Sequence, residues 1–444
     1  MKICLVSREF RPFRGGGIGT YARTFSSALA AAGHAVTVLT IAHPGEPEDA
    51  REGHLRVVRV PFMDGDDWSR PYGGADEAGR AIFNSRGPFA FLSRQFAFRI
   101  RDLERGGAFD AIEFPDTGAL GWFTLASLHA GEAVTRAPII VFAHSPTEWI
   151  ERLSGAPEPG DYVAGMRQME VDCFRLAHGV VAPSHDMSAW VESRAGLANG
   201  SVSVRALPVA DAKPTERAAS DRSNAELRLL FVGRCEVRKG IDTLVRAMAL
   251  IDHAQTPVRL VIAGADTPWP DGRMILDSLL KEHPRAAARV ERLGSLDEAG
   301  LARARSSCDA AVTPSPSDNF PYACAESMLA GLPMIASAAG GMGEMVRQGE
   351  DGLLFTPGDP VALARSIEAV SAIGHEGRRA MGLSARERVR VMCDPKTIVE
   401  QRVDHYRRVG ATLLELRAGT STPARTARSG GFLSRLARRV RNRP

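Results

Sequence analysis

The sequence PSPSDNFPYACAESMLAGLPMIASAAGGMGEMV runs from Pro314 to Val346 and combines a loop, a helix and a strand. A polar loop around Asp318 precedes an expected helix at 322–330. A short apolar strand at 333–337 then leads into a glycine loop at 340–341. A helix N-terminus and two loops therefore meet at one end of a predicted sheet, where unpaired N–H groups favour an anion such as a phosphate.

Two acidic residues of this stretch, Asp318 and Glu326, have seven residues between them. Glu326 lies one turn into the expected helix, where its carboxylate can accept hydrogen bonds from sugar hydroxyls. With the turn Gly340-Gly341-Met342-Gly343-Glu344, this spacing resembles the donor-site signature of retaining GT-B glycosyltransferases of the family 4 type (glycosyl transferases group 1). The first acid of that signature is usually Glu, and Asp318 is shorter. The resemblance implies donor contacts from Asp318, Asn319, Phe320, Pro321 and Glu326.

The resemblance also implies the architecture of the chain. It predicts an α/β protein with the GT-B fold, in which two Rossmann-like, doubly wound parallel-sheet domains face a central cleft. A length of 444 residues independently favours two domains. The predicted parts are an acceptor-side domain at 1–210, a linker at 211–226, a donor domain at 227–395, a helix at 396–416 that crosses back to the first domain, and a basic flexible tail at 417–444.

Two cations follow the first predicted strand of the second domain. The apolar run 227–232 leads into Gly233 and Arg234, and Lys239 comes five residues later. Arginine offers a planar fork of donors and lysine a mobile point charge. The pattern resembles the diphosphate clamp of the same family, in which two cations offset the charge of a departing diphosphate without a metal.

The first domain opens with a strand at 2–7 and a glycine loop at 15–19. Gly17-x-Gly19-x-x-Ala22 imitates a dinucleotide fingerprint, but seven residues separate the strand from the first glycine, and the second strand ends without an acid. These departures argue against NAD. The loop instead resembles the Gly-Gly-x-x-x-Tyr loop of the glycosyltransferase family, which implies donor contacts from Gly16 and Gly17. A glycine turn with only a packing role is the alternative.

Three polar residues lie at strand ends of the first domain. Glu113 and Asp116 end the strand at 111–114, on the edge where open α/β sheets bind ligands. Acceptor binding and helix capping are equal alternatives for Asp116. His144 follows the strand at 138–143 and precedes Ser145-Pro146-Thr147-Glu148, a predicted capping box. The resemblance places His144 against the transferred sugar or the acceptor.

These residues form the predicted sites. The acceptor contacts are Glu113, Asp116 and His144, and the catalytic residues are His144, Arg234, Lys239 and Asp318.

Composition excludes several other classes of protein. There is no apolar run of about 18 residues, so no transmembrane helix is expected. Six scattered cysteines fit reduced thiols in a cytoplasmic protein. The net charge of +4 comes from eight arginines at 417–444, without which the body carries −4 and has no basic character suited to nucleic acid. The sequence at 431–443 leaves two alternatives. One is a basic amphipathic helix that binds peripherally to the inner face of an anionic membrane, and the other is a disordered solubilising tail.

The resemblance implies a retaining hexosyltransferase that uses a UDP- or GDP-sugar and needs neither a metal nor another cofactor. The acceptor is expected to be a glycan, a lipid-linked glycan or a small molecule, in the synthesis of a cell-surface polysaccharide or glycoconjugate. Two alternatives share the fold, namely a nucleotide-sugar isomerase and a non-catalytic scaffold.

Overall fold

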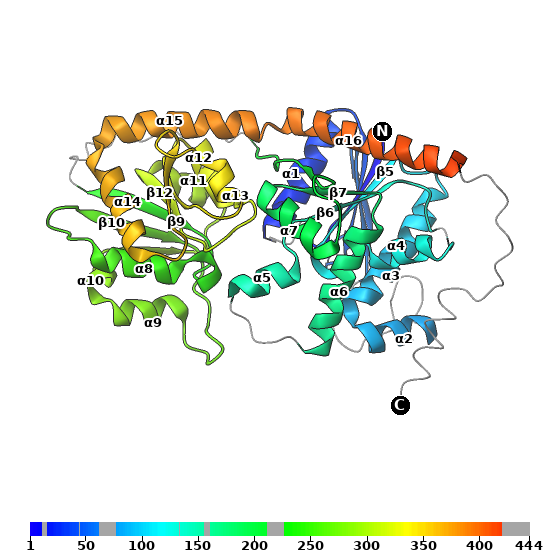
Figure 1. Cartoon of the computed structure of the whole chain (residues 1–444), viewed down its shortest axis with the longest axis horizontal. Helices are drawn as coiled ribbons and strands as arrows, with labels where there is room; N and C mark the ends of the chain where they lie inside the picture. Colours follow the sequence, from blue (N-terminus) through cyan, green and yellow to red (C-terminus); the bar gives the residue numbers. More distant parts are fainter. Residues whose placement is uncertain are drawn as a thin grey trace. The chain divides into compact units, whose positions relative to one another are not determined.

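The computed structural model describes residues 1–10, 16–43, 45–61, 77–132, 134–154, 160–210 and 226–419. The chain divides into two compact units (Figure 1). Unit 1 contains Met1–Pro183, Met187–Pro208 and the segment from Pro395, and unit 2 contains Ser184–Asp186 and Val209–Asp394. The predicted membrane helix at 431–443 lies outside the described residues.

Unit 1 is built on an eight-stranded sheet with the order β3-β4-β2-β1-β5-β6-β7-β8. Its pairs are parallel except for β3 with β4. The order of the strands reverses between β1 and β5, which makes the carboxyl ends of these two strands the switch point of the sheet. The strands are β1 (Lys2–Val6), β2 (Ala35–Ile41), β3 (Asp49–Glu52), β4 (Leu55–Val60), β5 (Ala111–Pro115), β6 (Ile139–Phe142), β7 (Gly179–Ala182) and β8 (Ser203–Val204).

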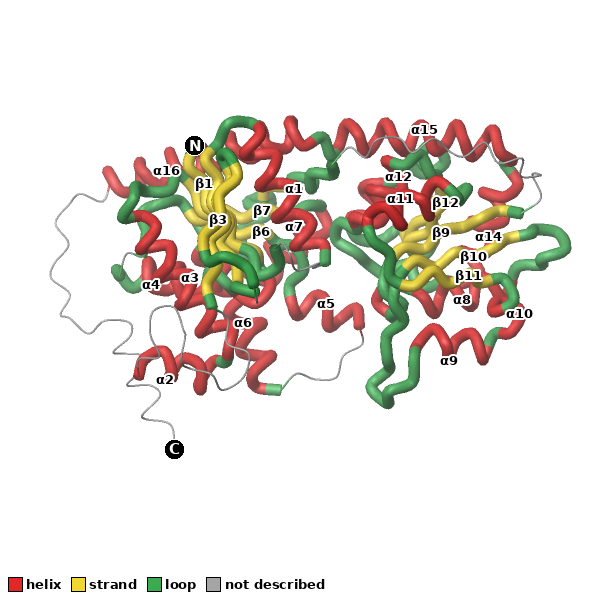
Figure 2. The backbone as a smooth tube through the Cα atoms, turned by 180° about the vertical axis from the view of Figure 1, so that it is seen from behind, coloured by secondary structure: helices red, strands yellow, loops and turns green. Residues whose placement is uncertain are grey.

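Helices cover both faces of this sheet. Figure 2 shows α3 and α4 on one side of the strands and α1 and α7 on the other. The helices are α1 (Gly17–Ala31), α2 (Glu77–Arg86), α3 (Pro88–Glu104), α4 (Trp122–His129), α5 (Thr147–Ser154), α6 (Asp161–Leu176), α7 (His185–Ala195) and α16 (Pro395–Gly419). A 3₁₀ turn, η1 (Thr117–Ala119), follows β5.

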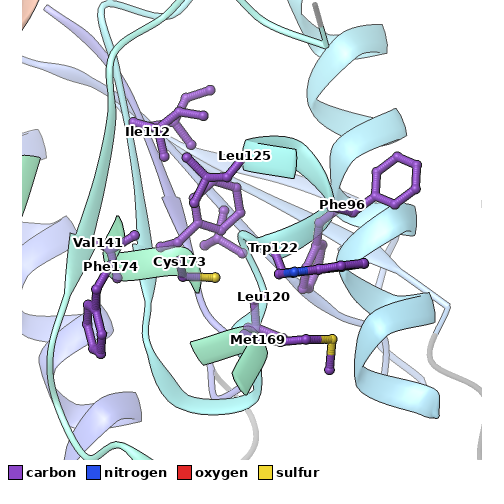
Figure 3. Packing of buried hydrophobic residues seen from close by; sticks show 14 of the residues in the cluster. Phe96, Ile112, Leu120, Trp122, Leu125, Val141, Met169, Cys173 and Phe174 are labelled. Atoms are coloured by element: carbon purple, nitrogen blue, oxygen red, sulfur yellow. The ribbon is translucent and has the colours of Figure 1, made fainter. Parts of the chain in front are cut away.

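Both faces of the sheet in unit 1 are apolar, as a doubly covered parallel sheet requires. Alternate residues of the central strands join a large core with side chains of α3, α4 and α6. Figure 3 shows part of this core, with Phe96, Ile112, Leu120, Trp122, Leu125, Val141, Met169, Cys173 and Phe174. The short apolar runs of the sequence therefore form buried strands because both their faces are covered.

Unit 2 contains a six-stranded sheet with the order β11-β10-β9-β12-β13-β14, in which all pairs are parallel. Its switch point lies between β9 and β12. The strands are β9 (Leu227–Val232), β10 (Val258–Ala263), β11 (Val290–Gly294), β12 (Ala310–Thr313), β13 (Met334–Ser337) and β14 (Gly352–Phe355).

The helices of unit 2 also lie on both faces of their sheet. Figures 1 and 2 agree in placing α8 and α9 on one face and α11 and α12 on the other. The elements are η2 (Val237–Lys239), α8 (Ile241–Leu250), α9 (Ile275–Glu282), α10 (Pro284–Ala287), α11 (Glu298–Ser306), α12 (Tyr322–Leu329), α13 (Gly341–Met345), α14 (Pro360–Ala372) and α15 (Gly374–Met392). Two doubly wound α/β units confirm the predicted fold class. Within the described residues, none of the helices has the length and apolar character needed to cross a membrane.

Candidate functional site

The two sides of the switch point in unit 2 are joined by an ion pair. Lys239 ends the turn η2 after β9, and Asp318 lies in the loop after β12. The Nζ atom of Lys239 lies 2.5 Å from Oδ2 of Asp318. Their side chains are 25% and 13% exposed, so both are partly desolvated and the attraction is stronger than that of an open surface pair. The structure thus brings together two of the predicted catalytic residues.

Close backbone contacts fix these loops. Gly240 has a φ of 74°, and a Cβ atom there would lie 2.0 Å from the carbonyl oxygen of Pro314. At Gly341 a Cβ atom would lie 1.8 Å from the carbonyl oxygen of Asn319, while its N–H donates to the carbonyl of Asp318 at 2.9 Å. Only glycine fits such an approach, so these two glycines set the position of the loop that carries Asp318.

The remaining predicted donor residues lie around this loop. Asn319, Phe320 and Pro321 are buried, and the Phe320 ring makes an edge contact with that of Tyr322. The side chain of Arg234 is 64% exposed and lies 3.3 Å from Glu236. Asn319 to Pro321 therefore shape the start of α12, whereas Arg234 remains available to a ligand.

Glu326 lies on α12 and forms an ion pair that the sequence did not reveal. Its Oε2 atom accepts a hydrogen bond from Nη2 of Arg305, near the end of α11. The sequence contains no indication of this pair, because the two residues are 21 positions apart. In addition, an arginine in a helix usually belongs to a solvated face.

In unit 1, Asp116 holds the loop that carries His144. Its Oδ1 atom accepts from the backbone N–H of His144 at 2.9 Å, and its Oδ2 atom accepts from that of Ser145 at 3.0 Å. The imidazole of His144 stacks on Phe142, with ring centroids 4.2 Å apart. Burial, with a smaller effect of Arg402, lowers the pKa of His144 to about 3. His144 is therefore a neutral imidazole near pH 7, suited to hydrogen bonding rather than to holding a positive charge.

A second buried carboxyl group, that of Glu170 on α6, holds the same region. It accepts from the backbone N–H groups of Gly118 at 2.9 Å and Thr147 at 2.8 Å, and from the Thr147 hydroxyl at 2.7 Å. The predicted capping box is not formed: Glu170 binds the first N–H of α5, and Glu148 pairs with Arg194 instead. A residue from another helix has taken the capping role because it is buried beside α5.

Glu170 should make the stability of unit 1 depend on pH. Burial first, and then Asp116, raise the pKa of Glu170 to about 8 from 4.5. A raised carboxyl pKa means that the folded state holds a proton that the unfolded chain has lost, so its contribution is complete below about pH 4.5 and is lost as pH rises through 8. We expect Glu170→Gln to flatten the fall in the free energy of unfolding between pH 6 and 8.

Urea unfolding at pH 6, 7 and 8 measures this effect, whose slope is limited to about 1.4 kcal/mol per pH unit for one proton. Burial also raises the pKa of Asp116 to about 6. The stability that depends on the proton of Asp116 is therefore lost as the pH rises to about 6, before the range measured here begins. Glu148→Gln, at a partly exposed glutamate of the same region that pairs with Arg194, is the control. Equal slopes in the wild type and in Glu170→Gln would contradict the assignment.

Glu113 is the centre of a buried polar cluster in unit 1. Its Oε1 atom accepts from the hydroxyl of Tyr21 at 2.6 Å. Its Oε2 atom accepts from the hydroxyl of Tyr406 at 2.6 Å and from Nη1 of Arg402 at 2.9 Å. Arg402 and Tyr406 belong to α16, and neither side chain is exposed. Acceptor binding by Glu113 stays a prediction, and these contacts favour a role in fastening α16 to β5.

The glycine loop of unit 1 begins α1. Gly16 is the N-cap residue and Gly17 the first residue of the helix, and no side chain caps it. Two residues further on, the N–H of Gly19 donates to Oε2 of Glu9 at 3.2 Å. The donor contacts predicted for Gly16 and Gly17 stay a prediction. Within the described residues, no group of three or more His, Cys, Asp and Glu side chains could hold a metal ion.

Comparison with known families accounts for both units. A family model described as Glycosyltransferase Family 4 matches residues 15–209, and one described as Glycosyl transferases group 1 matches residues 226–372. The chain belongs to these glycosyltransferases. The predicted family is thereby confirmed in both halves of the chain.

Relatives of this glycosyltransferase include a glycogen synthase of Mycobacterium tuberculosis, 26% identical over 83% of this chain and 86% of the relative. A D-inositol 3-phosphate glycosyltransferase of Thermomonospora curvata is 33% identical over 47% of this chain and 46% of the relative. Among solved structures, a sucrose-phosphate synthase from Thermosynechococcus elongatus is 25% identical, with a TM-score of 0.70 over 93% of this chain and 100% of that one. HepE of Anabaena, solved with UDP, has a TM-score of 0.64 at 18% identity over 91% of this chain and 99% of that one. These likenesses confirm the predicted GT-B fold.

Proposed function

We propose that this glycosyltransferase moves a hexosyl group from a nucleoside diphosphate sugar to an acceptor hydroxyl with retention at the anomeric carbon. The observation that carries the proposal is the pair of Lys239 and Asp318 across the switch point of unit 2, with exposed Arg234 at the end of β9. Open α/β sheets bind ligands at such a point. Two cations placed there offset the charge of a diphosphate leaving group.

In the proposed reaction, the bond between the anomeric carbon and the β-phosphate oxygen breaks. The acceptor oxygen forms its bond to the same face of the sugar, and its proton passes to the leaving phosphate oxygen. The diphosphate therefore acts as the general base. Lys239 and Arg234 stabilise its developing charge, Asp318 faces the donor sugar, and Glu326 accepts hydrogen bonds from the ribose. We propose no role for a metal or a protein nucleophile.

Unit 1 is proposed to bind the acceptor. His144 carries this assignment because Asp116 and Glu170 hold its loop from two directions, and its imidazole is neutral. A neutral imidazole can exchange hydrogen bonds with a sugar hydroxyl without repelling the oxocarbenium character of the transition state. The proposed context is the synthesis of a polysaccharide or glycoconjugate, in line with the glycogen synthase relative.

The informative experiment is incubation of the full chain with UDP-, GDP- and ADP-sugars. UDP and ADP are included because HepE was solved with UDP and starch synthase IV with ADP and acarbose. We expect hydrolysis or transfer with one nucleotide series, and a thermal shift with the matching nucleoside diphosphate. A sugar product that is an isomer of the donor sugar, without a glycosylated product, would favour an isomerase, and neither turnover nor a thermal shift with any donor would favour a scaffold.

A further inference from the structure

Glu326 lies on the one partly exposed face of its helix, α12. In α12, only Ala323 and Glu326 are partly exposed, whereas the six other side chains are buried. Positions three apart lie above one another on the same face of a helix. The packing of α12 therefore leaves one direction in which the Glu326 carboxylate can reach a ligand.

One oxygen of this carboxylate is held, and the other is open. Oε2 of Glu326 accepts from Nη2 of Arg305, while Oε1 accepts no hydrogen bond from any residue that the structure describes. The side chain of Glu326 is 33% exposed. A carboxylate that is held through one oxygen has already given up rotamer freedom before a ligand arrives. Binding then costs less conformational entropy. Its second oxygen can then meet an incoming hydroxyl in a prepared orientation.

The guanidinium of Arg305 is directed at Glu326. Its side chain is only 12% exposed, and within the described part of the chain Glu326 is its one hydrogen-bonding partner. The Nε atom is buried without a hydrogen bond. A buried charge with a single partner is weak evidence for stability, since desolvation offsets much of the attraction. Stability alone therefore gives a poor account of this arginine, whereas orientation of Glu326 gives a direct one.

Resting on the function proposed above, we infer that Arg305 is the positioning residue that orients Glu326 toward the ribose hydroxyls of the donor nucleotide. Arg305 itself need not touch the ligand. Its loss should remove the preference of unit 2 for a ribose over a sugar that lacks the 2′ and 3′ hydroxyls. A packing role alone would weaken all nucleotides together or lower stability, and would leave that preference intact.

The test compares UDP, GDP and ADP with their 2′,3′-dideoxy counterparts by calorimetric titration of the full-length protein. We expect the wild type to bind its preferred nucleotide about tenfold or more tightly than the dideoxy form, because a hydrogen bond to a charged group is lost. In Arg305→Met the ratio should fall to within about threefold, with little change in affinity for the dideoxy form. Arg305→Lys, which keeps the charge without the planar fork, should restore part of the ratio.

Controls separate this inference from the function on which it rests. Arg303→Met replaces an exposed arginine in the same turn of α11 and should keep the wild-type ratio. Thermal unfolding of each variant shows that it is folded. If Glu326→Ala loses the preference for the nucleotide over its dideoxy form but Arg305→Met keeps it, the inference is wrong and the role of Glu326 stands. If Glu326→Ala retains the ratio, the ribose role fails and the inference falls with it. If the wild type binds none of the nucleotides, the proposed function itself fails.

Discussion

Replacing Lys239 by alanine should lower kcat/KM for the nucleoside diphosphate sugar by about 10- to 100-fold. A hydrogen bond to a charged group contributes about 1.5–3 kcal/mol, and here the phosphate would lose such a donor in a partly desolvated site. The loss also leaves the Asp318 carboxylate without its partner at 2.5 Å. That unpaired negative charge would repel the diphosphate.

Asp318→Asn tests the repulsion. In the Lys239→Ala background, it should improve the affinity for the nucleoside diphosphate, whereas in the wild type it should not. Arg234→Ala should lower turnover by a similar factor, and Lys281→Ala, which removes an exposed lysine of α9, should have no effect. Steady-state kinetics with the donor identified in the panel measure the turnover of each variant, and calorimetric titration measures its affinity for the nucleoside diphosphate. Full activity of Lys239→Ala would overturn the proposed clamp and favour a scaffold.

The second large effect concerns stability. Glu113→Ala should lower the free energy of unfolding of unit 1 by about 3–5 kcal/mol, because it leaves the fully buried Arg402 charge without its carboxylate. The hydroxyls of Tyr21 and Tyr406 would also lose their acceptor. Urea unfolding followed by tryptophan fluorescence reports mainly on unit 1, because four of the five tryptophans lie in residues 1–208.

Two further variants test whether the buried charges cause this loss of stability. The double variant Glu113→Gln with Arg402→Met should be less destabilised than the sum of its single variants, since it removes both buried charges together. Asp404→Ala removes an exposed pair on the same helix, 3.6 Å from Arg407, and should cost less than about 1 kcal/mol. A Glu113→Ala variant as stable as Asp404→Ala would show that the cluster contributes nothing.

Much of the fold could be predicted from the sequence, because its central strands are buried on both faces and read as short apolar runs. The run 227–232 and the strand Met334–Ser337 are examples. The polar edge strand β3 and the helix α6 could not be placed in the same way. β3 is mostly exposed, so its side chains carry no alternating apolar pattern.

For the candidate site, too, some residues could be predicted from the local sequence and others could not. Residues at strand ends and in glycine loops, such as Lys239 and Asp318, could be found because local sequence fixes their place on the sheet. Glu170 and Arg305 could not be found, because each acts on a residue at least 21 positions away. Their type and local context fit an ordinary solvated helix. Only the packing of one helix against another shows that their polar groups are directed inward.

The contact of α16 with β5 bears on the order in which the chain acquires its structure during synthesis. Glu113 leaves the ribosome 289 residues before Arg402 and 293 before Tyr406. Domains generally fold as units from the N-terminus onward. Here the cluster in the first unit is completed only by α16, the last described helix, so the whole of unit 2 is made while a carboxylate at the centre of unit 1 still lacks two of its three partners. Until α16 is made, the nascent N-terminal unit therefore lacks part of the cluster that fastens the centre of its sheet.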